Sequence, residues 1–188
     1  MTQYSIHTRS GLPDEWQLLL RAHPRDSWPD HPNFARSIRN WMGAHQMFRD
    51  LGALTEDDTR SVAAGEMELA RFAGRLSHFG GLLVANLHGH HGWEDRSFFP
   101  ELSPADPRFD AGLETLESDH LVLDETLERF TRRANRVVQL AQLDEAQSLE
   151  EARHLQDDAA AITRFLARHL ADEEDLVVPI LLHHGLRS

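Results

Sequence analysis

Residues 90–100, HHGWEDRSFFP, and residues 169–179, HLADEEDLVVP, carry the same four features in the same register. Each stretch begins with a histidine, has a glutamate four residues later followed by a second acid, and ends with a proline ten residues after the histidine. On a helix, positions i and i+4 lie about 5–6 Å apart on one face, so each histidine and glutamate can aim at one point. A single pair of this kind is most often a solvated ion pair. Its repetition 79 residues further along the chain favours a shared function.

Four regions of the chain space their apolar residues as one face of a helix does, at intervals of three and four residues. They are residues 34–54, 69–87, 113–130 and 155–176. No stretch of β-branched residues alternates as a strand would. The polar runs at 55–60 and 144–151 fit either a turn or a helix surface, while Pro100 and Pro179 are expected to end the second helix and to disturb the fourth. We therefore predict an all-α, up-down-up-down four-helix bundle over residues 33–188.

Residues 1–32 differ from the rest of the chain and are expected to form a short N-terminal extension. Prolines punctuate this segment, and the acids after Pro13 favour one short helix that ends before Pro24. Trp16 and Trp28 are large apolar side chains for which burial is favourable. We predict an ordered arm that packs these two tryptophans on the bundle, with a loosely attached arm as the alternative.

Two more histidines fall at the height of the repeated motif when the four helices are laid antiparallel. Consecutive antiparallel helices bring together residues that lie equally far from the turn joining them. His45 and His90 flank a turn near residues 65–69, where Gly65 stands, with arms of about 20 residues or roughly 30 Å. His120 and His169 flank a turn near residues 144–145 in the same way. The bundle therefore places one histidine from each helix on a single level.

Six side chains are accordingly predicted to surround a two-metal site. They are His45, His90, Glu94, His120, His169 and Glu173. Asp124, which follows His120 by one helical turn, is a possible extra ligand. An ion pair or a surface role is the alternative for Asp124.

The acids that follow the two glutamates are predicted to support the site rather than to bind metal. Asp95 and Glu174 are placed to accept hydrogen bonds from ligand histidines, or else to be solvated acids. The neighbouring register of His91 points about 100° away from His90 and has Leu170 at the equivalent position of the repeat. His91 is therefore not assigned to the site.

The composition excludes several other kinds of function. The chain has 31 acidic residues against 19 basic ones, all arginine, and a formal net charge of −12. Binding to nucleic acid or to an anionic membrane surface is therefore not expected. The absence of cysteine excludes disulfides, thiolate metal ligands and cysteine nucleophiles. No apolar run reaches the ~18 residues of a membrane span and no signal peptide is recognisable, so a cytoplasmic protein is expected.

These histidine and glutamate positions resemble those of the hemerythrin-like family, also called the HHE cation-binding domain. The resemblance rests on His45, the stretch from His90 to Pro100, Ser118-Asp119-His120 and the stretch from His169 to Pro179. It covers roughly residues 33–182. It implies a four-helix bundle around a non-haem di-iron centre, with Glu94 and Glu173 as bridging carboxylates and the histidines as terminal ligands.

The donor set agrees with this resemblance, with one departure. Imidazole and carboxylate without thiolate suit iron or manganese, and zinc would also bind. The order of histidine then glutamate at i+4 differs from the Glu-x-x-His pairs of ferritin-like proteins. Oxygen-carrying hemerythrins have a second histidine on the third helix, whereas this chain has Leu116 and Asp124 at four residues from His120. The missing imidazole argues against simple oxygen carriage and favours redox chemistry at an open metal position.

The resemblance therefore implies a protein with two iron ions that binds or reacts with O₂, peroxide or NO in redox or stress protection. The sequence leaves open whether it is an enzyme and what its protein partner is. An oxygen- or iron-sensing or storage module that acts through a partner is the alternative. Iron donation for repair of iron–sulfur centres ranks lower because the relatives that perform it carry paired cysteines. A structural zinc site is a further alternative.

Overall fold

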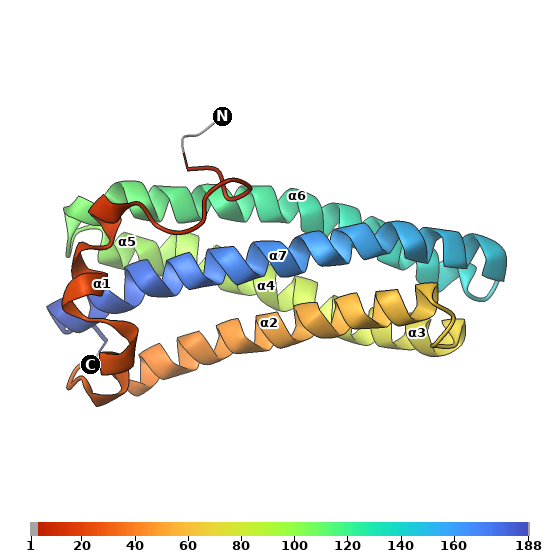
Figure 1. Ribbon diagram of the computed structural model, residues 1–188, viewed down its shortest axis with the longest axis horizontal. Coiled ribbons are helices and arrows are strands. Elements are labelled where there is room, and N and C mark those ends of the chain that lie inside the picture. The colour runs from red at the N-terminus through yellow and green to blue at the C-terminus, as the bar shows by residue number, and fades with distance from the viewer. Residues whose placement is uncertain (1–3, 188) are drawn as a thin grey trace. The chain divides into compact units, whose positions relative to one another are not determined.

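Every regular element in residues 4–187, the part of the chain that this computed structural model describes, is helical (Figure 1). The long α-helices are α2 (Arg36–Ala63), α6 (Asp110–Leu140) and α7 (Glu145–His184), and the shorter ones are α1 (Leu18–Ala22), α3 (Leu69–Arg75), α4 (Gly81–Trp93) and α5 (Phe99–Leu102). The π-helical segments are η3 (Leu76–Gly80) and η4 (Glu94–Phe98), and the 3-10 segments are η1 (Asp14–Trp16), η2 (Arg25–Asp30) and η5 (Pro107–Phe109). None of the described helices is both long and apolar enough to cross a membrane. The prediction of an all-α protein is confirmed.

The chain divides into two units, each assembled from distant parts of the sequence. The first unit holds the described residues up to Gln46, His90–His120 and the described residues from Ala167 onward. The second unit holds Met47–Gly89 and Leu121–Leu166. Helices α2, α4, α6 and α7 each contribute residues to both units. Each unit therefore contains segments of the same four helices.

The core of the first unit includes apolar side chains from the residues that precede α2. Trp16 and Trp28 are buried there, in a cluster that also contains Ile38 of α2, Leu113 of α6 and Ile180 of α7. The indole of Trp28 donates a hydrogen bond of 2.7 Å to the carbonyl of His23. Burial of two tryptophans gives this segment a large apolar contact with the helices.

The second unit has a core of its own and contains both long-helix connections. Its fully buried side chains include Phe48, Phe72, Leu83, Leu127, Phe130 and Leu155. Helix α2 ends at Ala63, and Gly65 follows with a φ of 76°, a left-handed conformation that favours glycine. The second connection lies between Leu140 and Glu145. Both turns fall where the sequence predicts them, and the ambiguous polar runs are mostly helix.

Pro179 does not disturb its helix, contrary to the sequence prediction, whereas the helical run that contains Pro100 ends two residues after it, at Leu102. Pro100 is the second residue of α5, where a missing N–H leaves no helical hydrogen bond unmade. Pro179 lies inside α7, which continues to His184. Val178 and Ile180 on either side of it are fully buried. Burial of this apolar stretch outweighs the roughly 3 kcal/mol that an internal proline costs a helix.

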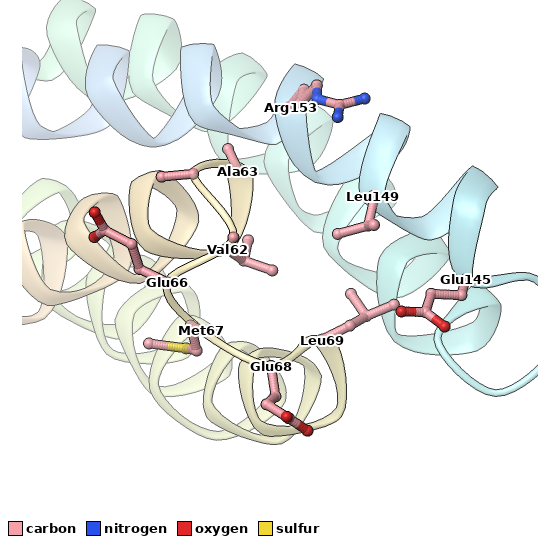
Figure 2. Close-up of a pocket in the computed structure, with 11 residues that line it drawn as sticks. Val62, Ala63, Glu66, Met67, Glu68, Leu69, Glu145, Leu149 and Arg153 are labelled. Atoms are coloured by element: carbon pink, nitrogen blue, oxygen red, sulfur yellow. The ribbon is translucent and has the colours of Figure 1, made fainter.

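A pocket of about 620 Å³ opens in the second unit, between the connection after α2 and the beginning of α7 (Figure 2). Met67, Leu69, Glu145, Leu149 and Arg153 are among the side chains that line it. No histidine lines this pocket, so its chemistry differs from that of the site described next.

Candidate metal centre

Seven histidine and glutamate side chains of the first unit converge in two groups. The first group is His45 from α2, His90 from α4, Glu94 from η4 and Glu173 from α7, and the second group is His91 from α4, His120 from α6 and His169 from α7. Within each group, one possible ligand atom of every residue lies within 4.8 Å of those of the others. All are donors of the kinds that bind transition metals.

In each group, two imidazoles bring their Nε2 atoms close together. His45 Nε2 lies 3.0 Å from His90 Nε2 in the first group. His120 Nε2 lies 3.1 Å from His169 Nε2 in the second. Each group therefore has a point at which two ring nitrogens meet.

His91 adds a third imidazole to the second group. Its side chain is buried, at 2% exposure, and neither ring nitrogen has a hydrogen-bond partner among residues 4–187. The ring stacks on that of His120, with centroids 4.0 Å apart and an 8° angle between the planes, and meets His169 edge-on at 5.6 Å. A buried polar group without a partner costs about 1–3 kcal/mol, so this position is unfavourable unless something else binds the nitrogens.

Glu94 stands between the two groups. Its Oε1 lies 2.9 Å from His90 Nε2, and its Oε2 lies 3.9 Å from His120 Nε2. The indole of Trp41 donates a hydrogen bond of 2.7 Å to Oε1. Burial opposes the charge on Glu94, but interactions with His90 and the Trp41 hydrogen bond contribute to a lowered pKa overall. The residue begins the π-helical segment η4, a local widening of the helix that is often found at functional sites.

Glu173 stands between the groups from the opposite element, α7. Its Oε2 lies 3.4 Å from His45 Nε2 and 3.8 Å from His169 Nε2. The side chain is fully buried, and neither oxygen has a hydrogen bond of normal geometry within the described residues. Burial and the adjacent negative charge of Glu94 raise the pKa of Glu173 well above its usual range. Two buried carboxylates are thus held side by side.

Three carboxylates that belong to neither group lie within hydrogen-bond distance of Nδ1 of three of the histidines. Glu174 Oε1 lies 3.1 Å from His45 Nδ1, Asp95 Oδ1 lies 2.7 Å from His120 Nδ1 and Asp119 Oδ2 lies 3.2 Å from His169 Nδ1. An Nδ1–H that donates to a carboxylate fixes the tautomer in which Nε2 carries a free lone pair. Each of these rings therefore presents Nε2 as a donor to the centre.

Burial lowers the pKa of three of these histidines, His45, His91 and His169, which favours the neutral imidazole. Burial is the main cause that lowers the pKa of His45 and, to about 4, that of His169. Burial, reinforced by the neighbouring histidines, holds the pKa of His91 well below its usual value. Neutral imidazole is the form that binds metal ions, so these rings are available without the loss of a proton.

The structure brings together all six side chains that the sequence singles out for the site. Of the two roles that the sequence leaves open for Asp95 and Glu174, the structure has each carboxylate against a histidine, at Nδ1 of His120 and of His45 respectively. Asp124 does not join either group: its Oδ1 lies 3.2 Å from Nδ1 of His88 in the second unit, and both side chains are nearly half exposed.

Sequence reasoning missed His91 and Asp119. Neighbouring residues on a helix point about 100° apart, so His90 and His91 cannot face one point, and the helical spacing excludes His91 from a site centred on His90. The site has two groups, however, and each of the two rings borders one of them. One signal in the sequence could have indicated His91. It directly follows His90, and the chain has no second histidine four residues from His120 to complete the ligand set. Asp119 precedes His120 and reaches His169 on α7.

Comparison with known proteins places the chain in a family. Residues 36–182 match the hemerythrin family model, described as the hemerythrin HHE cation binding domain. Because the match covers more than half of the chain, the protein belongs to the hemerythrin family. The resemblance seen in the sequence is confirmed, and the family description agrees with a cation-binding role for the clustered histidines and glutamates. Searches of the curated proteins and of the solved structures found no match.

Proposed function

We propose that the two groups hold two iron ions and that the protein binds or reacts with O₂, peroxide or NO. The observation that carries this proposal is the convergence of seven imidazole and carboxylate donors, in two adjacent groups, within one unit of the chain. The family to which the chain belongs supports the binding of cations. The identity and number of the ions rest on the donor chemistry.

The separations of the ring nitrogens fit a shared ion. Metal–imidazole bonds of about 2.1 Å place two nitrogens about 3.0 Å apart at a right angle, and about 3.4 Å apart at a tetrahedral angle. The observed Nε2 separations of 3.0 and 3.1 Å match the right angle. Separations of this size let one ion contact both nitrogens of a pair, and a donor set of imidazole and carboxylate suits iron, manganese or zinc.

The buried donors that lack protein partners fit the same interpretation. His91, Glu94 and Glu173 each have side-chain atoms without a normal hydrogen bond among the described residues. Native proteins seldom leave such atoms unsatisfied. Two divalent cations between these side chains would satisfy them and neutralise the two adjacent carboxylates.

The two groups differ in the number of imidazoles, which gives the site a reactive side. With Glu94 and Glu173 shared, the first group offers four protein ligands and the second offers five. An ion held by the first group would have fewer protein ligands, which would leave more positions for a small molecule. His90, a member of that group, is 9% exposed, whereas the other members are fully buried. We propose that O₂, peroxide or NO enters beside His90.

His91 also bears on whether the protein binds O₂ reversibly or consumes the oxidant. The absence of a second histidine on α6 argues against oxygen carriage, but His91 supplies a third imidazole to the same group from α4. Reversible binding and consumption of the oxidant are therefore distinguished by experiment. When bound, a pair of iron ions supplies the electrons for such chemistry. The chain's own residues orient the ligands, and their burial excludes bulk water.

We further propose that the helical segments around the site are those of the four-helix hemerythrin bundle. Support comes from the first unit, where α2, α4 with η4, α6 and α7 each bring at least one side chain to the two groups. A site built in this way from facing helices is typical of metal-binding bundles.

A spectroscopic titration tests the proposed function. The protein is loaded with Fe²⁺ without air and then titrated with O₂, and in parallel with NO and hydrogen peroxide. We expect ligand-to-metal charge-transfer bands whose intensity saturates at two irons per chain. Bands that disappear when O₂ is removed indicate a carrier or sensor, and bands that persist indicate turnover. Bound iron with no spectral response to any of the three, or stoichiometric zinc in place of iron, would contradict the proposal.

A further inference from the structure

The residues that precede α2 lie outside the hemerythrin match, yet two of their arginines reach the carboxylates that hold site histidines. Arg25, in η2, contacts Glu174, which holds His45. Arg9 contacts Asp119, which holds His169. The N-terminal segment is defined here as residues 4–35. In each group, one of its arginines therefore contacts the carboxylate that contacts a histidine of that group. Figure 1 shows this segment in red, running over α6 and α7.

Arg25 is fixed on α7 by several contacts. Its Nη1 donates to Glu174 Oε2 over 2.8 Å, and the other oxygen of that carboxylate faces His45 Nδ1. Its Nε donates to Asp175 over 2.6 Å and its Nη2 to the carbonyl of Ala171 over 3.0 Å. The guanidinium also lies 5.0 Å from the ring centroid of Trp28 in the same segment. The position of Arg25 therefore depends on the docking of this segment.

Arg9 makes the equivalent connection on the other side of the site, and it is more deeply buried, with a side chain only 5% exposed. Its Nη1 donates to Asp119 Oδ1 over 3.0 Å, its Nη2 to Asp119 Oδ2, and its Nε to Asp172 over 2.7 Å. Burial opposes the charge on Asp119, but the hydrogen bonds with His169 and Arg9 lower its pKa overall. Arg9 thereby joins α6, α7 and the N-terminal segment.

The third outer carboxylate shows why the buried ones require an arginine. Asp95, which contacts Nδ1 of His120, is 38% exposed, so solvent can reach its carboxylate. Glu174 and Asp119 are each 5% exposed, so a protein cation must replace the solvent that they lose. Arginine suits this role because its guanidinium binds carboxylates in a fixed geometry.

We propose that the N-terminal segment contributes two positioning residues to the metal centre. Arg9 orients His169 through Asp119, and Arg25 orients His45 through Glu174. This inference rests on the proposed function, because it requires that the two groups bind metal. Outer partners of ligand histidines typically contribute 10–100-fold to metal affinity. By linkage, bound metal strengthens the docking of the segment as much as the docked segment strengthens metal binding.

The experiment compares Arg25→Gln and Arg9→Gln with the matched control Arg21→Gln in the full-length protein loaded with Fe²⁺. Arg21 belongs to the same segment, but its Nη2 donates a hydrogen bond of 3.0 Å to the carbonyl of Asp14. We expect Arg25→Gln and Arg9→Gln to release iron to a chelator about 10–100-fold faster than the parent protein, and Arg21→Gln to release it at the parent rate. Circular dichroism checks that each variant keeps its helices; Arg25, at 41% exposure, is the safer change.

The midpoint potential separates positioning from simple stabilisation of the segment. Loss of a cation near the site favours the more oxidised metal, so both glutamine variants shift the potential to more negative values. Arg25→Lys keeps the charge and restores the parent potential. Limited proteolysis of the N-terminal segment provides an independent readout, and bound iron should slow it in the parent and in Arg21→Gln more than in the other two variants.

The outcomes distinguish this inference from the proposed function. If the parent binds two irons but all three variants match it in release rate and potential, the inference is wrong and the proposed function stands. If Arg21→Gln changes iron release as much as Arg25→Gln, the segment only stabilises the fold and the inference is again wrong. If the parent binds no iron, the proposed function fails and the inference fails with it.

Discussion

Replacement of His91 by phenylalanine is predicted to change stability in opposite directions with and without metal. In the metal-free protein, His91 buries two ring nitrogens that lack hydrogen-bond partners among residues 4–187. Phenylalanine removes both while keeping an aromatic ring against His120, where the centroids are 4.0 Å apart. Relief of unpartnered polar atoms is worth about 1–3 kcal/mol each, and the larger ring costs about 1–3 kcal/mol in packing. We expect a net gain of about 1 kcal/mol, or roughly 2–4 °C in melting temperature.

With metal present, the same substitution is predicted to be destabilising. Metal that binds only the folded protein stabilises it by about 2.7 kcal/mol for each site when the free ion is at 100 times its Kd. Without His91, the second group keeps only two imidazoles, His120 and His169. Most of the stabilisation from an ion in that group is then lost, and this loss exceeds the gain seen without metal.

Chemical denaturation of His91→Phe and the parent protein, once with a chelator and once with saturating Mn²⁺, checks both signs. His78→Phe is the control, because His78 is exposed and belongs to neither group. If His91→Phe lowers the free energy of unfolding by the same amount with and without metal, His91 is a packing residue and the reasoning is refuted.

Three further outcomes are predicted. Glu173→Ala removes the carboxylate that faces both groups, so anaerobically loaded protein should hold at most one iron per chain by elemental analysis, while His78→Ala holds as much as the parent. Burial lowers the pKa of His169 to about 4 from an ordinary value near 6.5, so between these pH values the unfolded chain binds a proton that the folded, metal-free chain does not. The free energy of unfolding should therefore be highest above about pH 6.5 and should fall by about 3 kcal/mol as the pH drops toward 4. Chemical denaturation of the metal-free protein at a series of pH values measures this change. The hydrogen bonds from Arg108 and His184 hold the pKa of Asp106 well below its usual range, so Asp106→Asn should lower the free energy of unfolding by about 1.5–3 kcal/mol at pH 7, and the difference should shrink as the pH falls below about 4.

The sequence predicted much of the site because the governing distances are local or follow from equal helix lengths. His90 with Glu94, and His169 with Glu173, are fixed by the i to i+4 spacing of a helix. The four-helix level assigned to His45 depended on a turn near Gly65, which the structure contains.

The rest could not be predicted because it depends on packing between distant segments. Pro179 follows a local rule that favours disruption, and burial of its neighbours overrides that rule. Helical spacing excludes His91 from a metal site shared with His90, because the two side chains point in different directions. Only the positions of His120 on α6 and His169 on α7 show that His91 belongs to a second group. Arg9 and Asp119 are 110 residues apart, so no local pattern could connect them.

The metal content of the chain tests the central claim most directly. Protein freed of metal with a chelator is loaded anaerobically with excess Fe²⁺, passed through a desalting column and analysed for iron and protein together. The two groups predict two irons per chain that survive the column. One iron or none per chain, in protein that circular dichroism shows to be folded, would contradict a two-metal centre.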